Sequence, residues 1–103
     1  MECVKLFYKD ELVGILTYNA PNYCFSKNEE FSKKSILYHM GLNEKCEYYS
    51  TKLFHFFYKF IPEKERIDII EKANINLEVD SEYEILKKVA RLYLNKSQFW
   101  IGL

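Results

Sequence analysis

The 103-residue sequence is poor in glycine and has no long apolar run. Its three glycines, Gly14, Gly41 and Gly102, are too scattered to form a loop whose backbone N–H groups cradle a phosphate. No apolar stretch approaches the roughly 20 residues of a membrane helix, and residues 1–5 resemble no secretory signal. We therefore expect a cytoplasmic protein that binds neither nucleotides nor membranes.

An excess of charge of one sign is also absent. Fifteen Lys and Arg residues are matched by 15 Asp and Glu residues, so the general attraction to nucleic acid is missing. Two aromatic pairs, Tyr48-Tyr49 and Phe99-Trp100, could stack on bases, but that mode also needs a basic groove. A small nucleic-acid-binding protein remains a remote alternative.

The sequence has no closely spaced cysteine pair. Cys3, Cys24 and Cys46 stand about 20 residues apart, which suits neither a disulfide framework nor a zinc site and predicts reduced thiols. We expect no metal and no cofactor.

The residues that could carry catalysis lack a supporting context. A nucleophile and base could be drawn from Cys46 or Ser50 with His39 or His55, but no glycine turn flanks them. Acidic pairs such as Glu63 and Glu65 lie in polar runs typical of a solvated surface. The sequence therefore predicts a non-catalytic protein.

Hydrophobic residues make up 49% of the chain and aromatic residues 17%, enough for a folded core. The length fits one domain, residues 1–103. Alternating apolar residues over 3–18 predict a β-hairpin in which Val13, Ile15 and Thr17 share a side and Gly14 marks a bulge or a close backbone approach. Further strands are expected over 23–26 and 35–40.

The spacing of apolar residues changes to three or four after residue 50 and predicts helices. The first covers 50–60, with Phe54, Phe57 and Phe60 on or near its buried stripe, and Pro62 ends it. A second begins at 62–63 with Ile67, Ile70 and Ala73 on its apolar face. A third is expected over 81–94 behind a capping box, followed by a turn over 95–97 and a strand over 98–103. The fold class is therefore α+β: a single small domain with an antiparallel sheet, begun by the hairpin, and about three helices.

Three segments resemble the N-terminal domain that precedes the kinase core in HipA-type serine/threonine kinases. They are "VKLFYKDELVGILTY" at 4–18, "LFHFFYKFIPEKER" at 53–66 and "YEILKKVA" at 83–90. The chain departs from the family pattern at Lys64-Glu65, at Ala90 and in "SILYHMGL" at 35–42. The resemblance implies a HipA N-terminal-like fold.

The sequence given stops where the family's kinase core would begin, so we expect no phosphorylation by this chain. A free-standing domain of this kind resembles HipS, the antitoxin of three-part HipBST modules. That resemblance implies binding to a HipT-like kinase toxin, with a helix-turn-helix HipB-like protein in a ternary complex. The alternative is an isolated N-terminal structural domain of a HipA-like kinase.

The partner-facing edge is predicted at the joint between the first two helices. A helix that stops at proline exposes side chains on a stiff turn, and four charged residues in succession are hard to place in a core. The resemblance points to the same segment. If this segment is only a solvated helix start, the aromatic surface around Tyr48, Tyr49 or Trp100 becomes the better interface. The predicted contact residues are Ile61, Pro62, Glu63, Lys64, Glu65 and Arg66.

Overall fold

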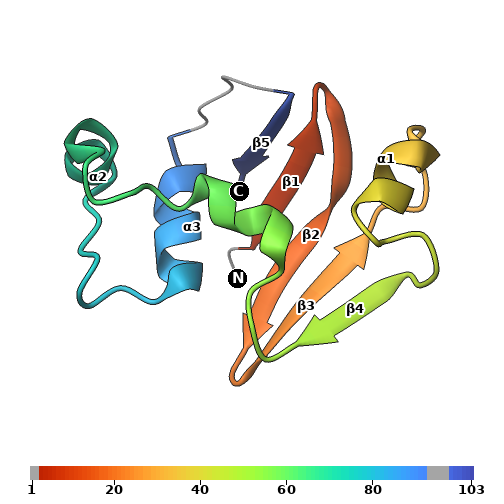
Figure 1. Cartoon of the computed structure of the whole chain (residues 1–103), viewed down its shortest axis with the longest axis horizontal. Helices are drawn as coiled ribbons and strands as arrows, with labels where there is room; N and C mark the ends of the chain where they lie inside the picture. Colours follow the sequence, from red (N-terminus) through yellow and green to blue (C-terminus); the bar gives the residue numbers. More distant parts are fainter. Residues whose placement is uncertain (1–2, 93–97) are drawn as a thin grey trace.

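The computed structural model describes residues 3–92 and 98–103. Five strands and four helical segments follow one another along these residues (Figure 1), and their class confirms the α+β prediction. In chain order they are β1 (Val4–Tyr8), β2 (Glu11–Asn19), β3 (Asn22–Lys27), α1 (Lys34–His39), β4 (Glu47–Ser50), the 3-10 helix η1 (His55–Phe60), α2 (Ile67–Ala73), α3 (Glu82–Ala90) and β5 (Phe99–Gly102).

The strands form one antiparallel sheet in the order β4-β3-β2-β1-β5. The predicted hairpin supplies β1 and β2, and β2 occupies the centre. β5 pairs with β1, so that Lys5 lies opposite Gly102. The predicted strands at 23–26 and 98–103 are present as β3 and β5.

A β-bulge interrupts the pairing of β1 and β2. Leu6 pairs with Gly14 and Phe7 with Leu12, which leaves Val13 as the extra residue. A β-carbon on Gly14 would lie 2.6 Å from the carbonyl oxygen of Ser26 on the neighbouring strand. Both predicted reasons for a glycine here, a bulge and a close backbone approach, therefore apply.

The bulge changes which β2 side chains face the core. Val13 and Leu16, three residues apart, are both fully buried. Ile15 and Thr17 are only half-buried and point to the opposite face. The predicted alternation of Val13, Ile15 and Thr17 is therefore wrong beyond residue 13, because the extra residue reverses the order of the following side chains.

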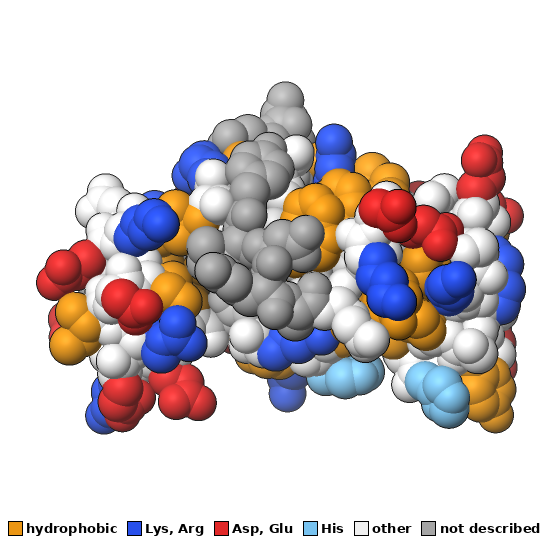
Figure 2. Space-filling model, turned by 90° about the horizontal axis from the view of Figure 1, so that it is seen from above, with side chains coloured by type: hydrophobic (Ala, Val, Ile, Leu, Met, Phe, Trp, Pro, Cys, Tyr) orange, Lys and Arg blue, Asp and Glu red, His pale blue; other side chains and the backbone are white. Residues whose placement is uncertain are grey.

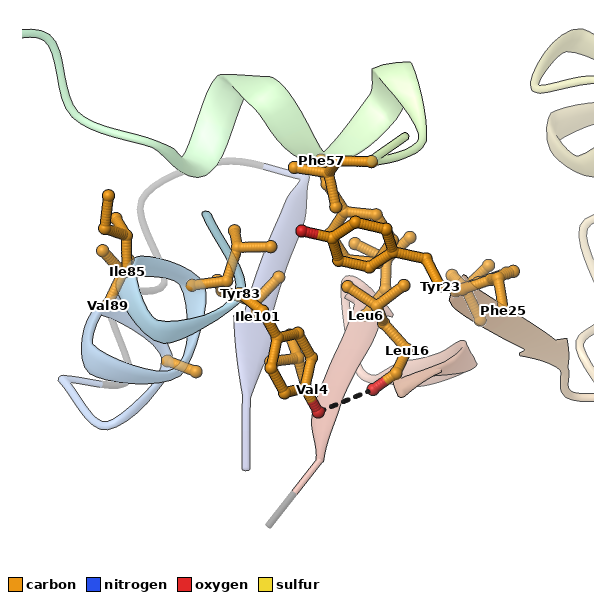
Figure 3. Close-up of a cluster of buried hydrophobic side chains, with 14 of the residues drawn as sticks. Val4, Leu6, Leu16, Tyr23, Phe25, Phe57, Tyr83, Ile85, Val89 and Ile101 are labelled. Atoms are coloured by element: carbon orange, nitrogen blue, oxygen red, sulfur yellow. Dashed lines mark hydrogen bonds between the residues drawn. The ribbon is translucent and has the colours of Figure 1, made fainter. Parts of the chain in front are cut away.

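The helical segments and one face of the sheet enclose a hydrophobic core (Figure 3). We call this sheet face, which carries Val4, Leu6, Leu16, Phe25 and Ile101, the inner face. η1 and α3 lie against it (Figures 1 and 3). The most deeply buried large side chains of the core, from the sheet, the helical segments and one loop, are Phe25, Phe31, Phe57, Leu6, Leu16, Leu86, Val4 and Val13.

Two segments in the middle of the chain differ from the predictions. The predicted strand over 35–40 is the short helix α1, in which Leu37 is buried and Ile36 and Met40 are half-buried one turn apart. Leu37 and Met40 follow Ile36 by one and four residues, and this spacing places all three on one face of a helix. Strand β4 was not predicted, although the Tyr48-Tyr49 pair has high β propensity.

The helices after residue 50 also differ in extent. The first predicted helix is shortened to η1, with Phe57 buried as expected. α2 begins at Ile67 instead of at the proline, and Ile67 is 60% exposed, so its predicted place on the buried face is wrong. α3 starts as predicted behind Ser81, whose side chain accepts a hydrogen bond from the Glu84 backbone N–H. The predicted end of this helix and the turn over 95–97 lie outside the described residues.

No helix in the described part of the chain is both long and apolar enough to cross a membrane. Cys3, Cys24 and Cys46 are free; Cys46 is exposed, and the other two are half-buried.

Candidate protein-binding site

The joint between η1 and α2 is an extended segment followed by a tight turn. Ile61 has an extended backbone and ends η1, and Pro62 follows, which cannot donate a backbone hydrogen bond. The Arg66 backbone N–H then donates to the Glu63 carbonyl at 2.9 Å, which closes a turn over residues 63–66. The joint therefore presents a fixed sequence of side chains between two helical segments.

The joint borders a hollow of about 350 Å³. Four of the six predicted contact residues line it: Ile61, Pro62, Glu63 and Arg66. Tyr58 and Lys59, at the end of η1, complete the lining. The other two predicted residues, Lys64 and Glu65, are exposed at the tip of the turn and do not line the hollow.

The side of the hollow formed by η1 is anchored in the core. Phe57 is fully buried, and its ring lies 5.8 Å from that of Phe25 on β3. Lys59 places its ammonium 4.1 Å from the centre of the Phe99 ring on β5. Partial desolvation in this position lowers the pKa of Lys59. Contacts to two different strands therefore hold η1 in place.

Tyr58 connects the hollow to the start of α3. Its side chain is 45% exposed. Partial desolvation, followed by the negative charge of Glu82 and a hydrogen bond to it, raises the pKa of Tyr58. The hydroxyl therefore stays protonated at neutral pH and donates its one proton to Glu82, so its oxygen can accept a hydrogen bond from a partner.

The hollow carries charges of both signs. Glu63 is acidic, whereas Lys59 and Arg66 are basic, and Arg66 already pairs with the Asp68 carboxylate at 3.4 Å. The end of the molecule around α2 likewise shows acidic and basic side chains interspersed with apolar ones (Figure 2). The hollow therefore lacks the one-sided basic charge that binding to a nucleic-acid backbone uses.

The residues considered for catalysis do not form a reactive pair. The Cys46 thiol hydrogen-bonds to Glu29, and this contact raises the pKa of Cys46. A nucleophilic cysteine needs the opposite shift. His39 lies at the end of α1 and His55 at the start of η1, both exposed. Within residues 3–92 and 98–103, no group of three His, Cys, Asp or Glu side chains is arranged to hold a metal ion.

The alternative aromatic surface is divided between the two faces of the sheet. Neighbouring residues of a strand point to opposite faces, so neither Tyr48-Tyr49 nor Phe99-Trp100 makes a two-ring platform. Tyr48 is half-buried, and its hydroxyl accepts hydrogen bonds from the backbone N–H groups of Glu44 and Lys45. Tyr49 is 67% exposed on β4, at the other edge of the sheet from Trp100.

Sequence reasoning did not identify Tyr58 and Lys59 as part of the site. The helical spacing had assigned Phe57 and Phe60 to the core, and the two residues between them fall on the exposed side of the same turn. Their position on the exposed side, about one turn before Pro62, is the signal that could have found them.

The sequence profile of the HipA N-terminal domain matches residues 4–92, from the first residue of β1 to just beyond α3. No curated protein and no solved structure matches the chain. The matched family is the N-terminal domain of HipA and not its catalytic kinase domain. Because the match covers most of the sequence, the chain belongs to the HipA N-terminal domain family.

Proposed function

We propose that this chain is a HipS-type antitoxin that binds a HipT- or HipA-like serine/threonine kinase and holds it inactive. The joint over residues 61–66 is its partner-binding segment. A HipB-like helix-turn-helix protein completes a ternary complex and supplies the DNA contacts. The complex forms in the cytoplasm.

The observation that carries this proposal is the hollow beside the joint. The sequence predicts six partner contacts over residues 61–66, and four of them, Ile61, Pro62, Glu63 and Arg66, line the hollow, whereas Lys64 and Glu65 do not. The hollow is bordered by an anchored helix, and partner contacts on a fixed backbone lose little conformational entropy on binding. Family membership supports a kinase as the partner, because the domain belongs to a kinase family while not being its catalytic domain.

A second candidate is an isolated N-terminal domain of a HipA-like kinase with a purely structural role. The family match favours it to the same degree, because the matched profile describes the N-terminal domain of a larger kinase. The two functions predict opposite effects on the kinase: an antitoxin lowers its activity, whereas a structural domain leaves the activity unchanged or raises it.

The first experiment co-expresses this chain with the kinase encoded beside it and isolates the complex through a tag on the kinase. Autophosphorylation of the kinase is then measured with and without the chain. Stable co-purification with suppressed phosphorylation supports the antitoxin. A complex with unchanged or higher phosphorylation supports the structural domain, and the absence of a complex contradicts both.

The second experiment tests the joint by reversing two charges, Glu63→Lys and Glu65→Lys. If these carboxylates are desolvated against the kinase, the double variant should bind about 2 kcal/mol or more weakly, roughly a 30-fold loss. Because Glu63 lines the hollow and Glu65 does not, the single variant Glu63→Lys should account for most of the loss.

The matched control reverses Glu30 and Glu44, two exposed carboxylates on the loops that flank α1. This variant changes the net charge equally, so general electrostatic attraction cancels in the comparison. Both double variants should keep the melting temperature of the wild type. A joint variant that folds, binds with wild-type affinity and still protects cells would place the interface elsewhere.

A further inference from the structure

The face of the sheet opposite the core carries a mixed apolar surface. We call it the outer face. Helices η1 and α3 pack on the inner face, and α2 packs on α3 (Figures 1 and 3), whereas the outer side chains keep intermediate or high exposure. Strand pairing places on the outer face the side chains of Phe7, Ile15, Thr17, Cys24, Tyr49 and Trp100.

The two aromatic side chains at one edge of this face are held in place. Phe7 and Trp100 stack with their ring centres 4.2 Å apart and their planes inclined by 11°. The Trp100 indole N–H donates to the Lys9 carbonyl at 2.6 Å. A half-exposed aromatic pair held in place in this way can anchor a protein interface, because tryptophan is enriched among the residues that contribute most to binding.

Charges of opposite sign stand on either side of the central strand. One row of paired residues crosses the sheet from Gly102 through Lys5, Ile15 and Ser26 to Glu47. Lys5 lies on β1 and Glu47 on the edge strand β4. In the described part of the chain no ion pair joins Lys5 to an acidic side chain, and Glu47 accepts hydrogen bonds from Ser26 and Tyr49.

This charge pattern is self-complementary about one axis. The strand order is centred on β2, so a two-fold axis parallel to β2 brings β1 over β3 and β5 over β4 of a second copy. Glu47 then stands beside Lys5 of the second copy, whose strand neighbour Gly102 is buried and carries no side chain. A two-fold axis perpendicular to the strands would instead place Glu47 of one copy against Glu47 of the other, and Lys5 against Lys5.

We propose that the outer face binds a second copy of this chain and forms a two-layer sheet dimer about the axis parallel to β2. The two sheets pack with their strands roughly aligned, as in β-sandwiches. The contact is isologous, so each Lys5–Glu47 pair occurs twice. The joint over residues 61–66 takes no part, and the dimer is independent of the proposed antitoxin function.

The test uses the isolated chain in sedimentation equilibrium. Concentrations extend up to about 100 µM, because small interfaces are often weak. Trp100 is the sole tryptophan, so its fluorescence reports burial of the outer face directly. The wild type should sediment as a dimer, and its tryptophan emission should shift to shorter wavelength as concentration rises.

Charge reversal makes the test specific. Lys5→Glu gives a face with acidic residues on both sides, and Glu47→Lys gives a face with basic residues on both sides. Each single variant should dimerise at least about tenfold more weakly, because two charge pairs are lost in every dimer. An equimolar mixture of the two variants should recover association, because each acidic face now meets a basic one.

Two further arms complete the experiment. Trp100→Ala should abolish association by removing the aromatic anchor, and circular dichroism shows whether the variant stays folded. Glu30→Lys, away from the sheet, should leave the dimer intact. A wild type that remains monomeric would overturn the proposal. So would a mixture of Lys5→Glu and Glu47→Lys that associates no better than either variant alone, or a dimer that forms with unchanged tryptophan emission.

Discussion

Gly14 on β2 and Phe25 on β3 lie so close that a β-carbon on Gly14 would stand 2.5 Å from the ring atom Cζ of Phe25. The substitution Gly14→Ala must therefore displace the ring, the Ser26 carbonyl or both. We expect it to lower the free energy of unfolding by about 1–3 kcal/mol, the usual cost of overpacking a core. Urea denaturation of the purified variant measures the loss.

A double-mutant cycle identifies the cause of this loss. Phe25→Leu removes the ring, which supplies two of the three close contacts, so Gly14→Ala should cost less in that background than in the wild type. The Ser26 carbonyl remains, so the rescue should be partial. Equal costs in both backgrounds would show that the ring does not oppose the added methyl group.

Phe57 tests whether η1 is held to the sheet by its central side chain. Phe57→Ala should lower the free energy of unfolding by about 3–5 kcal/mol, because a fully buried ring is lost and a cavity remains. Thermal denaturation should show a much lower melting temperature. His55→Ala, an exposed position of the same helix, is the control and should melt like the wild type.

Tyr23 should make the fold sensitive to alkali. Its burial, and then the nearby charge of Glu82, raises the pKa of Tyr23 from 10.0 to about 12. The folded state therefore binds this proton more tightly than the unfolded state does, and its contribution is complete below pH 10. The free energy of unfolding should fall as the pH rises from about 10 towards 12.

Tyr23→Phe keeps the ring, so it should reduce this alkaline fall without large loss of packing. Chemical denaturation across the same pH range provides the measurement. Tyr38→Phe, whose parent side chain is 67% exposed on α1, should show the wild-type dependence. An undiminished alkaline fall in Tyr23→Phe would assign it to another group.

Asp80 should make the fold sensitive to acid. Hydrogen bonds from the Asn76 backbone N–H at 2.9 Å and from the Lys88 ammonium at 2.7 Å lower the pKa of Asp80 below 3.8. Its contribution to stability is present above pH 3.8 and is lost as the pH falls through the lower pKa of the folded state. Asp80→Asn should therefore flatten the acid side of the stability profile, whereas Asp10→Asn, in the exposed hairpin turn, should not.

Much of the fold could be predicted from the sequence because local patterns specify it. The hairpin, β3, β5 and α3 each have a distinct spacing or cap, such as Ser81 before α3. The segment 35–40 was misassigned because a six-residue segment with only four apolar residues, Ile36, Leu37, Tyr38 and Met40, is too short to distinguish the two periods. The reversal after Val13 escaped prediction because the extra residue of a bulge is defined only by the pairing partner.

The candidate site was predictable only in part, for a related reason. Proline ends a helix through its own covalent structure, so the position of the joint follows from Pro62 alone. The hollow depends on where η1 lies against β5, which the contact between Lys59 and Phe99 defines. That contact joins residues 40 positions apart, and no local spacing encodes it.

The pairing of β5 with β1 has a consequence for synthesis of the protein. Lys5 on β1 acquires its neighbour Gly102 only after residue 102 has been made. Until then β1 is an open edge, which can pair with other chains. Contacts this distant along the sequence also slow folding. The sheet therefore closes after translation has passed residue 102, and a nascent chain shorter than this should depend on chaperones to stay unaggregated.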